Sequence, residues 1–268
     1  MTTLVYDLAH LHRYMFFALF LALMIGALEL GRLLGKRRRA QLDGRRDEGA
    51  TLVVGSVLGL LAFVLALNLS HASSRYDRRM TSTLEEVNAL GTALMQATAV
   101  GGEQADELTA KLRQYMQLRR AYIIAPGDDA TLRLISNQTN EMQNAIWALL
   151  VERMAESPGP PVTSLMNAIN NAFDASTAMR LAMEYRMPEQ LVLLLLMMSL
   201  LSTATVGYQF GLIDHKGRVP GIVLSVLWCV VVTEIIDIGS ARIWTLRTDT
   251  RVYDWTIETF EGLPDPVQ

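Results

Sequence analysis

The chain has 268 residues, of which 51% are hydrophobic and only 19% charged, with a net charge of -3, a mean hydropathy of +0.23 and one cysteine. The charged fraction lies below the roughly 25% of soluble domains but is too high for a chain that is membrane throughout. The lone Cys229 excludes an internal disulfide, no His or Cys spacing resembles a metal site, and the small net charge argues against nucleic-acid binding. We therefore expect a chain that is part bilayer and part aqueous, without a metal or other cofactor.

Four apolar stretches are long enough to cross a bilayer, which takes about 20 residues of helix. Lipid offers the backbone no hydrogen-bond partner, so these stretches must be helical. The first stretch is not expected to be a signal peptide, because its apolar run is too long and its basic cluster follows the run. The predicted spans are residues 14–34, 50–72, 191–213 and 221–243.

A large insert separates the second and third spans, and its apolar residues recur at helical spacing. Turn-forming residues interrupt this pattern at 101–102, 126–129 and 157–161, which predicts about four amphipathic helices. No turn signal separates the second span from the insert, so this span is predicted to continue as one long helix. The predicted fold is an all-α integral membrane protein with four transmembrane helices and a helical extramembrane insert. Its predicted parts are an N-terminal pair of spans (1–72), the extramembrane domain (73–188), a C-terminal pair of spans (189–246) and a tail (247–268).

The charges that flank the spans bear on orientation, because basic residues in short loops favour the cytoplasm. The two short loops are basic, which places the insert outside, on the periplasmic side of a bacterial inner membrane. Arginines also flank the insert and oppose this assignment. The short-loop residues are Lys36, Arg37, Arg38, Arg39, Arg45, Arg46, Lys216 and Arg218, and those of the insert are Arg75, Arg78, Arg79, Arg180 and Arg186.

The second span carries the residues that are most informative about function. Gly55 and Gly59 form a G-x-x-x-G motif, which lets another helix approach closely. Ordinary helix packing is one interpretation of this span. The other is a pore, in which copies of one apolar row form a constriction that gates by dewetting. The candidate pore-lining residues are Leu60, Phe63, Val64, Leu67, Asn68 and His71.

Ionisable residues within or beside the other spans are expected to have partners. Glu234 and Asp237 share a helix face and a sign, so we expect Arg242, an arginine of the insert or a bound cation beside them. A structural salt bridge, an ion or proton site and simple exposure at the interface all remain open. Glu29 and Arg32 are three residues apart and are expected to form a local pair.

The end of the second span resembles the bestrophin family of ion channels, with Asn68, a small residue at Ala72, and the Tyr-x-Arg element Tyr76 and Arg78. The sequence is more similar to uncharacterised bestrophin-like membrane proteins of bacteria and plants. In these an E-x-N-A-x-G-T element follows an arginine-rich helix start. The matching residues are Arg75, Arg78, Arg79, Glu86, Asn88, Ala89, Gly91 and Thr92, with Asp237 and Arg242 in the fourth span. The chain departs from true bestrophins at Arg79 and Met80, where those have an aromatic pair.

The resemblance implies a homo-oligomer, possibly a pentamer, with the second span around a central pore that conducts inorganic ions, and an insert in the cytoplasm. The partners expected are therefore the lipid bilayer, further copies of the chain and inorganic ions. An alternative is a membrane-anchored sensor or interaction protein whose helical insert binds a ligand or partner. No hydrolase, metalloprotease, P-loop or dinucleotide-binding motif occurs, so we do not expect an enzyme.

Overall fold

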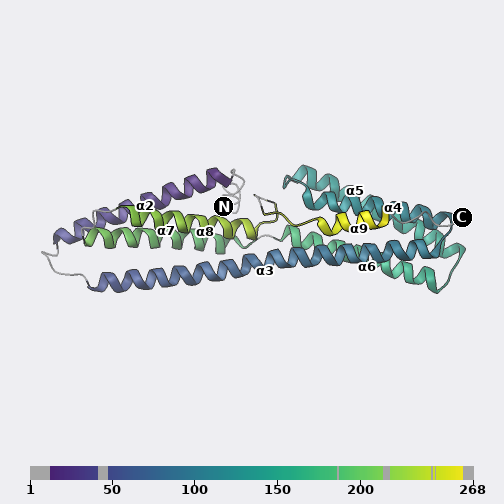
Figure 1. The fold of residues 1–268 in the computed structure, drawn as a ribbon, viewed down its shortest axis with the longest axis horizontal. Coiled ribbons are helices and arrows are strands. Elements are labelled where there is room, and N and C mark those ends of the chain that lie inside the picture. Colours follow the sequence, from purple (N-terminus) through teal and green to yellow (C-terminus); the bar gives the residue numbers. More distant parts are fainter. Residues whose placement is uncertain are drawn as a thin grey trace. The chain divides into compact units, whose positions relative to one another are not determined.

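The computed structural model describes residues 13–41, 48–185, 187–213, 218–242, 244 and 246–261. Every regular element among these residues is a helix (Figure 1), which confirms the predicted all-α class. Arg45, Arg46, Arg186 and Lys216, which entered the orientation argument, lie outside the described residues. The helices are α2 (Arg13–Gln41), α3 (Glu48–Val100), α4 (Glu103–Ile124), α5 (Asp129–Glu156), α6 (Pro160–Glu184), α7 (Glu189–Leu212), α8 (Val219–Gly239) and α9 (Arg251–Glu261).

The chain divides into two compact units. The first comprises Met1–Ser74 and Arg186–Leu246, and the second comprises Arg75–Tyr185 and Arg247–Gln268. The second unit thus contains α9, although the sequence analysis set residues 247–268 apart as a tail. The helix α3 contributes its beginning to the first unit and its end to the second.

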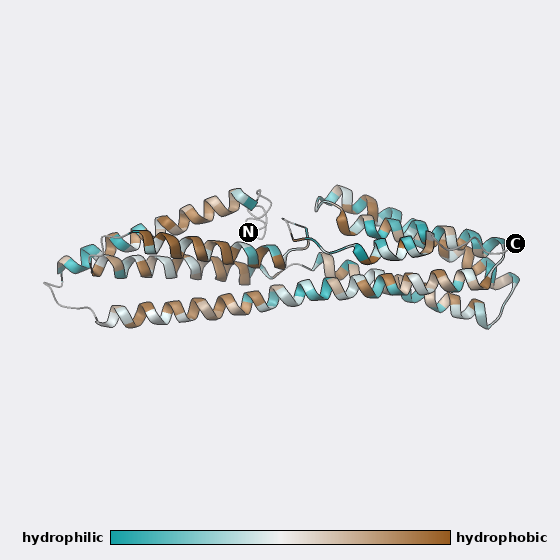
Figure 2. Ribbon diagram, in the orientation of Figure 1, coloured by the Kyte–Doolittle hydropathy of each residue, from teal (hydrophilic) through white to brown (hydrophobic). Residues whose placement is uncertain are grey.

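Four helices of the described chain are long and apolar enough to cross a membrane, and they coincide with the predicted spans. They are α2, the beginning of α3, α7 and α8. Figure 2 shows that apolar residues dominate α7 and α8, whereas α4 and α5 carry more polar residues. With 53 residues, α3 far exceeds the length that a bilayer requires, which confirms that the second span continues as one long helix.

The first unit is held together by apolar side chains from all four of its helices and by a close approach of α2 to α7. A Cβ atom added at Gly31 or Gly35 would overlap the backbone of α7, and one added at Gly207 or Gly211 would overlap the backbone of α2. Each pair is a G-x-x-x-G motif, so the two backbones pack directly against each other. The buried core includes Phe16, Phe20, Met24, Leu61, Val64, Ala72, Val192, Leu195, Cys229, Val232 and Ile235.

In the second unit, the helices begin and end where the sequence predicts breaks. Gly101 and Gly102 adopt φ values of 64° and 92°, which glycine tolerates and which turn the chain from α3 into α4. Asp128 caps α5 by accepting a hydrogen bond from the Thr131 amide over 2.8 Å. At the start of α6, proline occupies the first helical turn, where its missing N–H costs nothing.

Candidate functional site

The beginning of α3 buries only one narrow stripe in the first unit. Leu61, Val64, Asn68 and Ala72 are at most 6% exposed and follow one another at intervals of three or four residues. The Asn68 side-chain Nδ2 donates to the Val64 carbonyl over 2.9 Å, while its buried Oδ1 accepts no hydrogen bond from the described residues. Towards its start, α3 lies against α7, where Gln209 donates to Thr51 over 3.1 Å. At the end of the predicted span, near the middle of α3, a Cβ added at Gly239 of α8 would lie 3.6 Å from the Ala72 Cβ.

The candidate pore-lining residues of α3 therefore divide between two faces. Val64 and Asn68 lie in the packed interior of the unit, because they share the buried stripe. Leu60, Phe63 and Leu67 are 51%, 60% and 44% exposed, and His71 is exposed as well. Any pore built from copies of α3 would thus present the second group, and we leave Val64 and Asn68 out of the proposal below.

Gly55 and Gly59 lie on the open side of α3. A Cβ added at either would meet no atom within 4 Å, so among the residues that the structure describes this motif packs against nothing. The close helix contact is made instead by the motifs at Gly31 and Gly35 and at Gly207 and Gly211, which the sequence analysis did not single out. Their G-x-x-x-G spacing is the sequence pattern by which this helix contact could have been predicted.

The two acidic residues of α8, Glu234 and Asp237, both form ion pairs with Arg13, the first residue of α2. Arg13 donates to Asp237 over 3.2 Å and also pairs with Glu234, and the Leu246 amide donates to the other Asp237 oxygen over 3.3 Å. Asp237 is 1% exposed, so these partners replace the water that burial removes. Of the alternatives left open for this pair, a salt bridge is what the geometry shows, with Arg13 as the cation. Arg242 is half-buried.

Glu29 of α2 pairs across helices. Arg218, at the start of α8, reaches the Glu29 carboxylate with its Nε over 3.1 Å. The sequence analysis expected Arg32, one turn away on the same helix, as the partner. The interhelical contact fixes the beginning of α8 beside α2.

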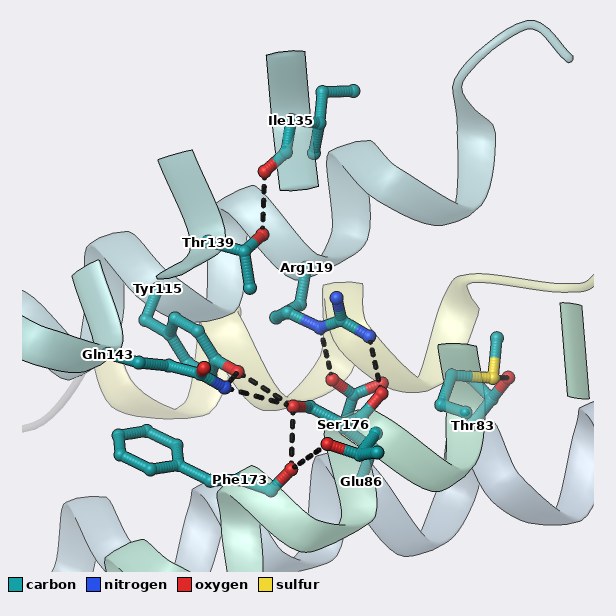
Figure 3. A network of polar contacts seen from close by, with 11 residues as sticks. Thr83, Glu86, Tyr115, Arg119, Ile135, Thr139, Gln143, Phe173 and Ser176 are labelled. Carbon is teal, nitrogen blue, oxygen red and sulfur yellow. Dashed lines mark hydrogen bonds and ion pairs between the residues drawn. The ribbon is translucent and has the colours of Figure 1, made fainter. Parts of the chain in front are cut away.

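A polar network lies in the interior of the second unit (Figure 3). Its centre is an ion pair between Glu86 of α3 and Arg119 of α4, with 2.5 Å between the Glu86 Oε1 and Arg119 Nε atoms. Both side chains are almost completely buried. Arg119 also donates to the Ser176 carbonyl of α6 over 3.0 Å. The pair therefore joins three helices through charge-assisted hydrogen bonds.

A second set of hydrogen bonds extends this network. The Tyr115 hydroxyl donates to Ser176 Oγ over 2.9 Å and accepts from Gln143 Nε2 over 2.8 Å. Burial would lower the pKa of Arg119, but the charge and hydrogen bond of Glu86 outweigh it and the pKa is raised. Burial raises the pKa of both Tyr115 and Tyr253. The network thus combines a permanent cation with neutral tyrosines.

The helix α9 packs over this network. Tyr253 is fully buried, and Glu86 adds to the burial that raises its pKa well above the usual value. A Cβ added at Gly91 would lie 3.7 Å from the Phe260 ring. Arg120 pairs with Asp254 over 2.5 Å. Two residues of the E-x-N-A-x-G-T element therefore have structural roles: Glu86 is an ion-pair partner, and Gly91 is the position on α3 against which Phe260 of α9 packs.

The remaining motif residues are placed as follows. Asn88 and Thr92 are exposed on α3. The Arg75 guanidinium lies 4.9 Å from the centre of the Tyr185 ring, and Arg78 is exposed. Arg79 is 1% exposed, and burial together with the neighbouring Arg75 charge lowers its pKa to about 10. Arg79 therefore remains cationic at neutral pH. Within the described residues, no group of three or more His, Cys, Asp or Glu side chains gathers as a metal site.

Comparison with known proteins gives matches among solved structures. A bacterial bestrophin homologue from Klebsiella pneumoniae matches with a TM-score of 0.64 at 13% identity, over 91% of this chain and 94% of that one. The chain has the fold of bacterial bestrophin homologues. A variant of the same homologue matches with a TM-score of 0.62 at 14% identity, over 90% and 99% of the two chains. No family profile and no curated protein matches.

A further structure, described as a membrane protein variant, matches with a TM-score of 0.62 at 15% identity, over 89% of this chain and 96% of the other. The bestrophin-like fold thus covers both units of the chain, whereas the resemblance in the sequence was carried by the second span, the beginning of the insert and part of the fourth span. A bestrophin-like fold with four apolar helices makes the chain an integral membrane protein.

Proposed function

We propose that the protein is a homo-oligomeric ion channel in which copies of α3 surround a central pore. The observation that carries the proposal is the open, uncharged side of α3. Only 17% of its most apolar stretch is buried within the chain, compared with 28% for α2 and 39% for α8. A span that packs so little against its own chain has most of its surface available for other copies, for a pore or for lipid.

The composition of the open side of α3 favours other copies and a pore over lipid. The exposed positions of α2 within the span are apolar, as contact with acyl chains requires, with Ala18, Ala22 and Gly26 among large side chains such as Leu19 and Leu23. The exposed positions of α3 include small and polar residues among the leucines: Gly55, Ser56, Gly59, Ala62, Ala66, Ser70 and His71. Small residues allow helices of neighbouring copies to approach, and polar residues suit a wet lumen.

Cyclic symmetry would place the same residues of every copy around one axis. The exposed side chains of Leu60, Phe63 and Leu67 lie on one side of α3, because they are separated by three and four residues. Repeated around an axis, they form stacked apolar rings, and such constrictions gate by dewetting. The G-x-x-x-G motif at Gly55 and Gly59, which is open in the chain, would lie against a neighbouring copy.

The direct test is conductance of the purified protein in planar bilayers. We expect Phe63→Ala and Leu67→Ala to increase conductance or open probability, because each widens an apolar ring. Leu23→Ala is the matched control, since Leu23 is 52% exposed but lies on α2. The proposal fails if the wild-type oligomer does not conduct, or if all three substitutions leave the currents alike.

A further inference from the structure

One face of α2 is exposed along the whole span. Its large apolar side chains are between 45% and 60% exposed and recur at intervals of three, four or seven residues up to the adjacent pair Leu33 and Leu34, which keeps them on one side of the helix. From the first to the last, the stripe covers about 30 Å of helix, the thickness of the hydrocarbon core of a bilayer. The residues are Met15, Leu19, Leu23, Leu30, Leu33 and Leu34.

A basic cluster follows this stripe without a break in the helix. The residues Lys36, Arg37, Arg38 and Arg39 all belong to α2 and all are exposed. Arg37 follows Leu30 by seven residues and Leu34 by three, so it continues the apolar face by one more turn. With the apolar stripe in the hydrocarbon core, its guanidinium would lie where acyl chains end and headgroups begin.

The local charge around this cluster is positive. The sequence of α2 contains one acidic residue, Glu29, and its carboxylate is engaged by Arg218 over 3.1 Å. Four successive basic residues beside a membrane surface attract anionic lipids, and guanidinium groups bind phosphate oxygens in a bidentate fashion.

We propose that the end of α2 is a binding site for an anionic phospholipid. The headgroup phosphate accepts hydrogen bonds from Arg37 and Lys36, and an acyl chain lies along Leu30, Leu33 and Leu34. The continuity of the apolar stripe with the cluster favours a lipid over a soluble anion, because only an amphipathic ligand contacts both. The inference concerns α2 alone and stands whether or not α3 lines a pore.

The experiment uses the full chain in detergent, titrated with phosphatidylglycerol or phosphatidylcholine, with bound lipid counted by native mass spectrometry. Preference for phosphatidylglycerol that weakens at high salt is expected. The double variant Lys36→Gln, Arg37→Gln should lose affinity by roughly 25-fold, since each basic residue at an anionic surface accounts for about a fivefold effect. The matched control is Arg133→Gln, which removes an exposed arginine from α5 in the second unit and should bind as the wild type does.

Three outcomes would overturn the proposal. They are equal binding of the two lipids, wild-type affinity in the double variant, and full competition by millimolar inorganic phosphate, which would assign the cluster to a free anion. Thermal unfolding of both variants in detergent without added lipid establishes that they are folded. The variant Lys36→Arg, Arg37→Lys exchanges the two basic residues and keeps both charges, so it should retain the preference for phosphatidylglycerol. Loss of that preference would also count against a site defined by positive charge.

Discussion

At the scale of single residues, the second unit depends on one buried ion pair. Glu86 and Arg119 come from different helices and are both almost inaccessible to water. Removing two charges from water is costly, and only close contact with further hydrogen bonds offsets that cost. Here the Ser176 carbonyl accepts a second hydrogen bond from Arg119, so the guanidinium is held on two sides.

Breaking this pair should be far more damaging than breaking an exposed one. Arg119→Gln leaves the Glu86 carboxylate buried without its cation, and we expect a loss of about 3 to 5 kcal/mol in the free energy of unfolding. Denaturant unfolding of the full chain in detergent, followed by tryptophan fluorescence, measures the change.

The matched control lies on the same helix. Glu107→Gln breaks the ion pair between the Glu107 Oε1 and Lys111 Nζ atoms, which are 3.8 Å apart on partly exposed side chains. This change should lower the free energy of unfolding by at most about 1 kcal/mol. Similar losses for the two variants would show that the buried pair contributes no more than a surface one.

The sequence identified one member of each ion pair more readily than its partner. Glu86 stood out through a motif, but Arg119 lies 33 residues later within an unremarkable stretch of α4. In the first unit, the expected partners of Glu234 and Asp237 were Arg242, an arginine of the insert or a bound cation, whereas Arg13, which pairs with both, lies 224 residues from Asp237. Partners that a tertiary fold brings together leave no local spacing by which to recognise them.

At the scale of helices, the chain contains three G-x-x-x-G motifs in its spans, and the structure uses them differently. Those of α2 and α7 face each other, and that of α3 is open. The motif alone states that close approach is permitted. It does not state which helix approaches, which is why the sequence predicted packing at Gly55 and Gly59 without identifying a partner.

Adding one methyl group, by a glycine-to-alanine substitution, distinguishes a packed G-x-x-x-G motif from an open one. Gly207→Ala would push its Cβ into the Leu28 carbonyl, so α2 and α7 must move apart, and we expect a loss of about 1 to 3 kcal/mol or more. Gly59→Ala adds a methyl group that meets no atom within 4 Å among the described residues, and alanine favours a helix by about 1 kcal/mol over glycine, so the dissociated single chain should lose no stability. Thermal unfolding of both variants tests this order, and a Gly59→Ala loss as large as that of Gly207→Ala would contradict it.

Helix boundaries were more accessible to sequence reasoning than helix partners. The breaks between α3, α4, α5 and α6 fall at glycine, proline and aspartate clusters, because these residues disfavour helix interiors. The helix α9 was missed, although Tyr253, Ile257 and Phe260 recur at helical spacing. Its 11 residues are too few for a stable isolated helix, and packing of Tyr253 and Phe260 stabilises it.

At the scale of the whole molecule, the fold is shared with proteins that have only 13 to 15% of residues in common with this chain. Such low identity is compatible with one fold because cores require apolar residues of suitable volume more than particular side chains. The four apolar stretches and the helical spacing of the insert were therefore enough to predict the architecture. The open side of α3 could not be predicted as well, since this span carries no charge that marks one side and only tertiary packing identifies the buried stripe.

Disulfide cross-linking tests whether copies of the chain assemble with their α3 helices around a common axis. In a Cys229→Ser background, Phe63→Cys places a thiol on the open side of α3. If copies of α3 surround a narrow axis, thiols of different copies approach closely enough for a disulfide, which requires Cα atoms within about 7 Å. Mild oxidation in membranes should then give a species of twice the 29.8 kDa chain mass on a non-reducing gel.

The matched variant for cross-linking is Leu23→Cys in the same background. Its thiol lies on the exposed face of α2, which we expect to contact lipid, so oxidation should leave it as a single chain. A cross-link through residue 23 with none through residue 63 would instead place α2 between copies. That result would move the symmetry axis to the α2 side and exclude α3 as the lining of a central pore.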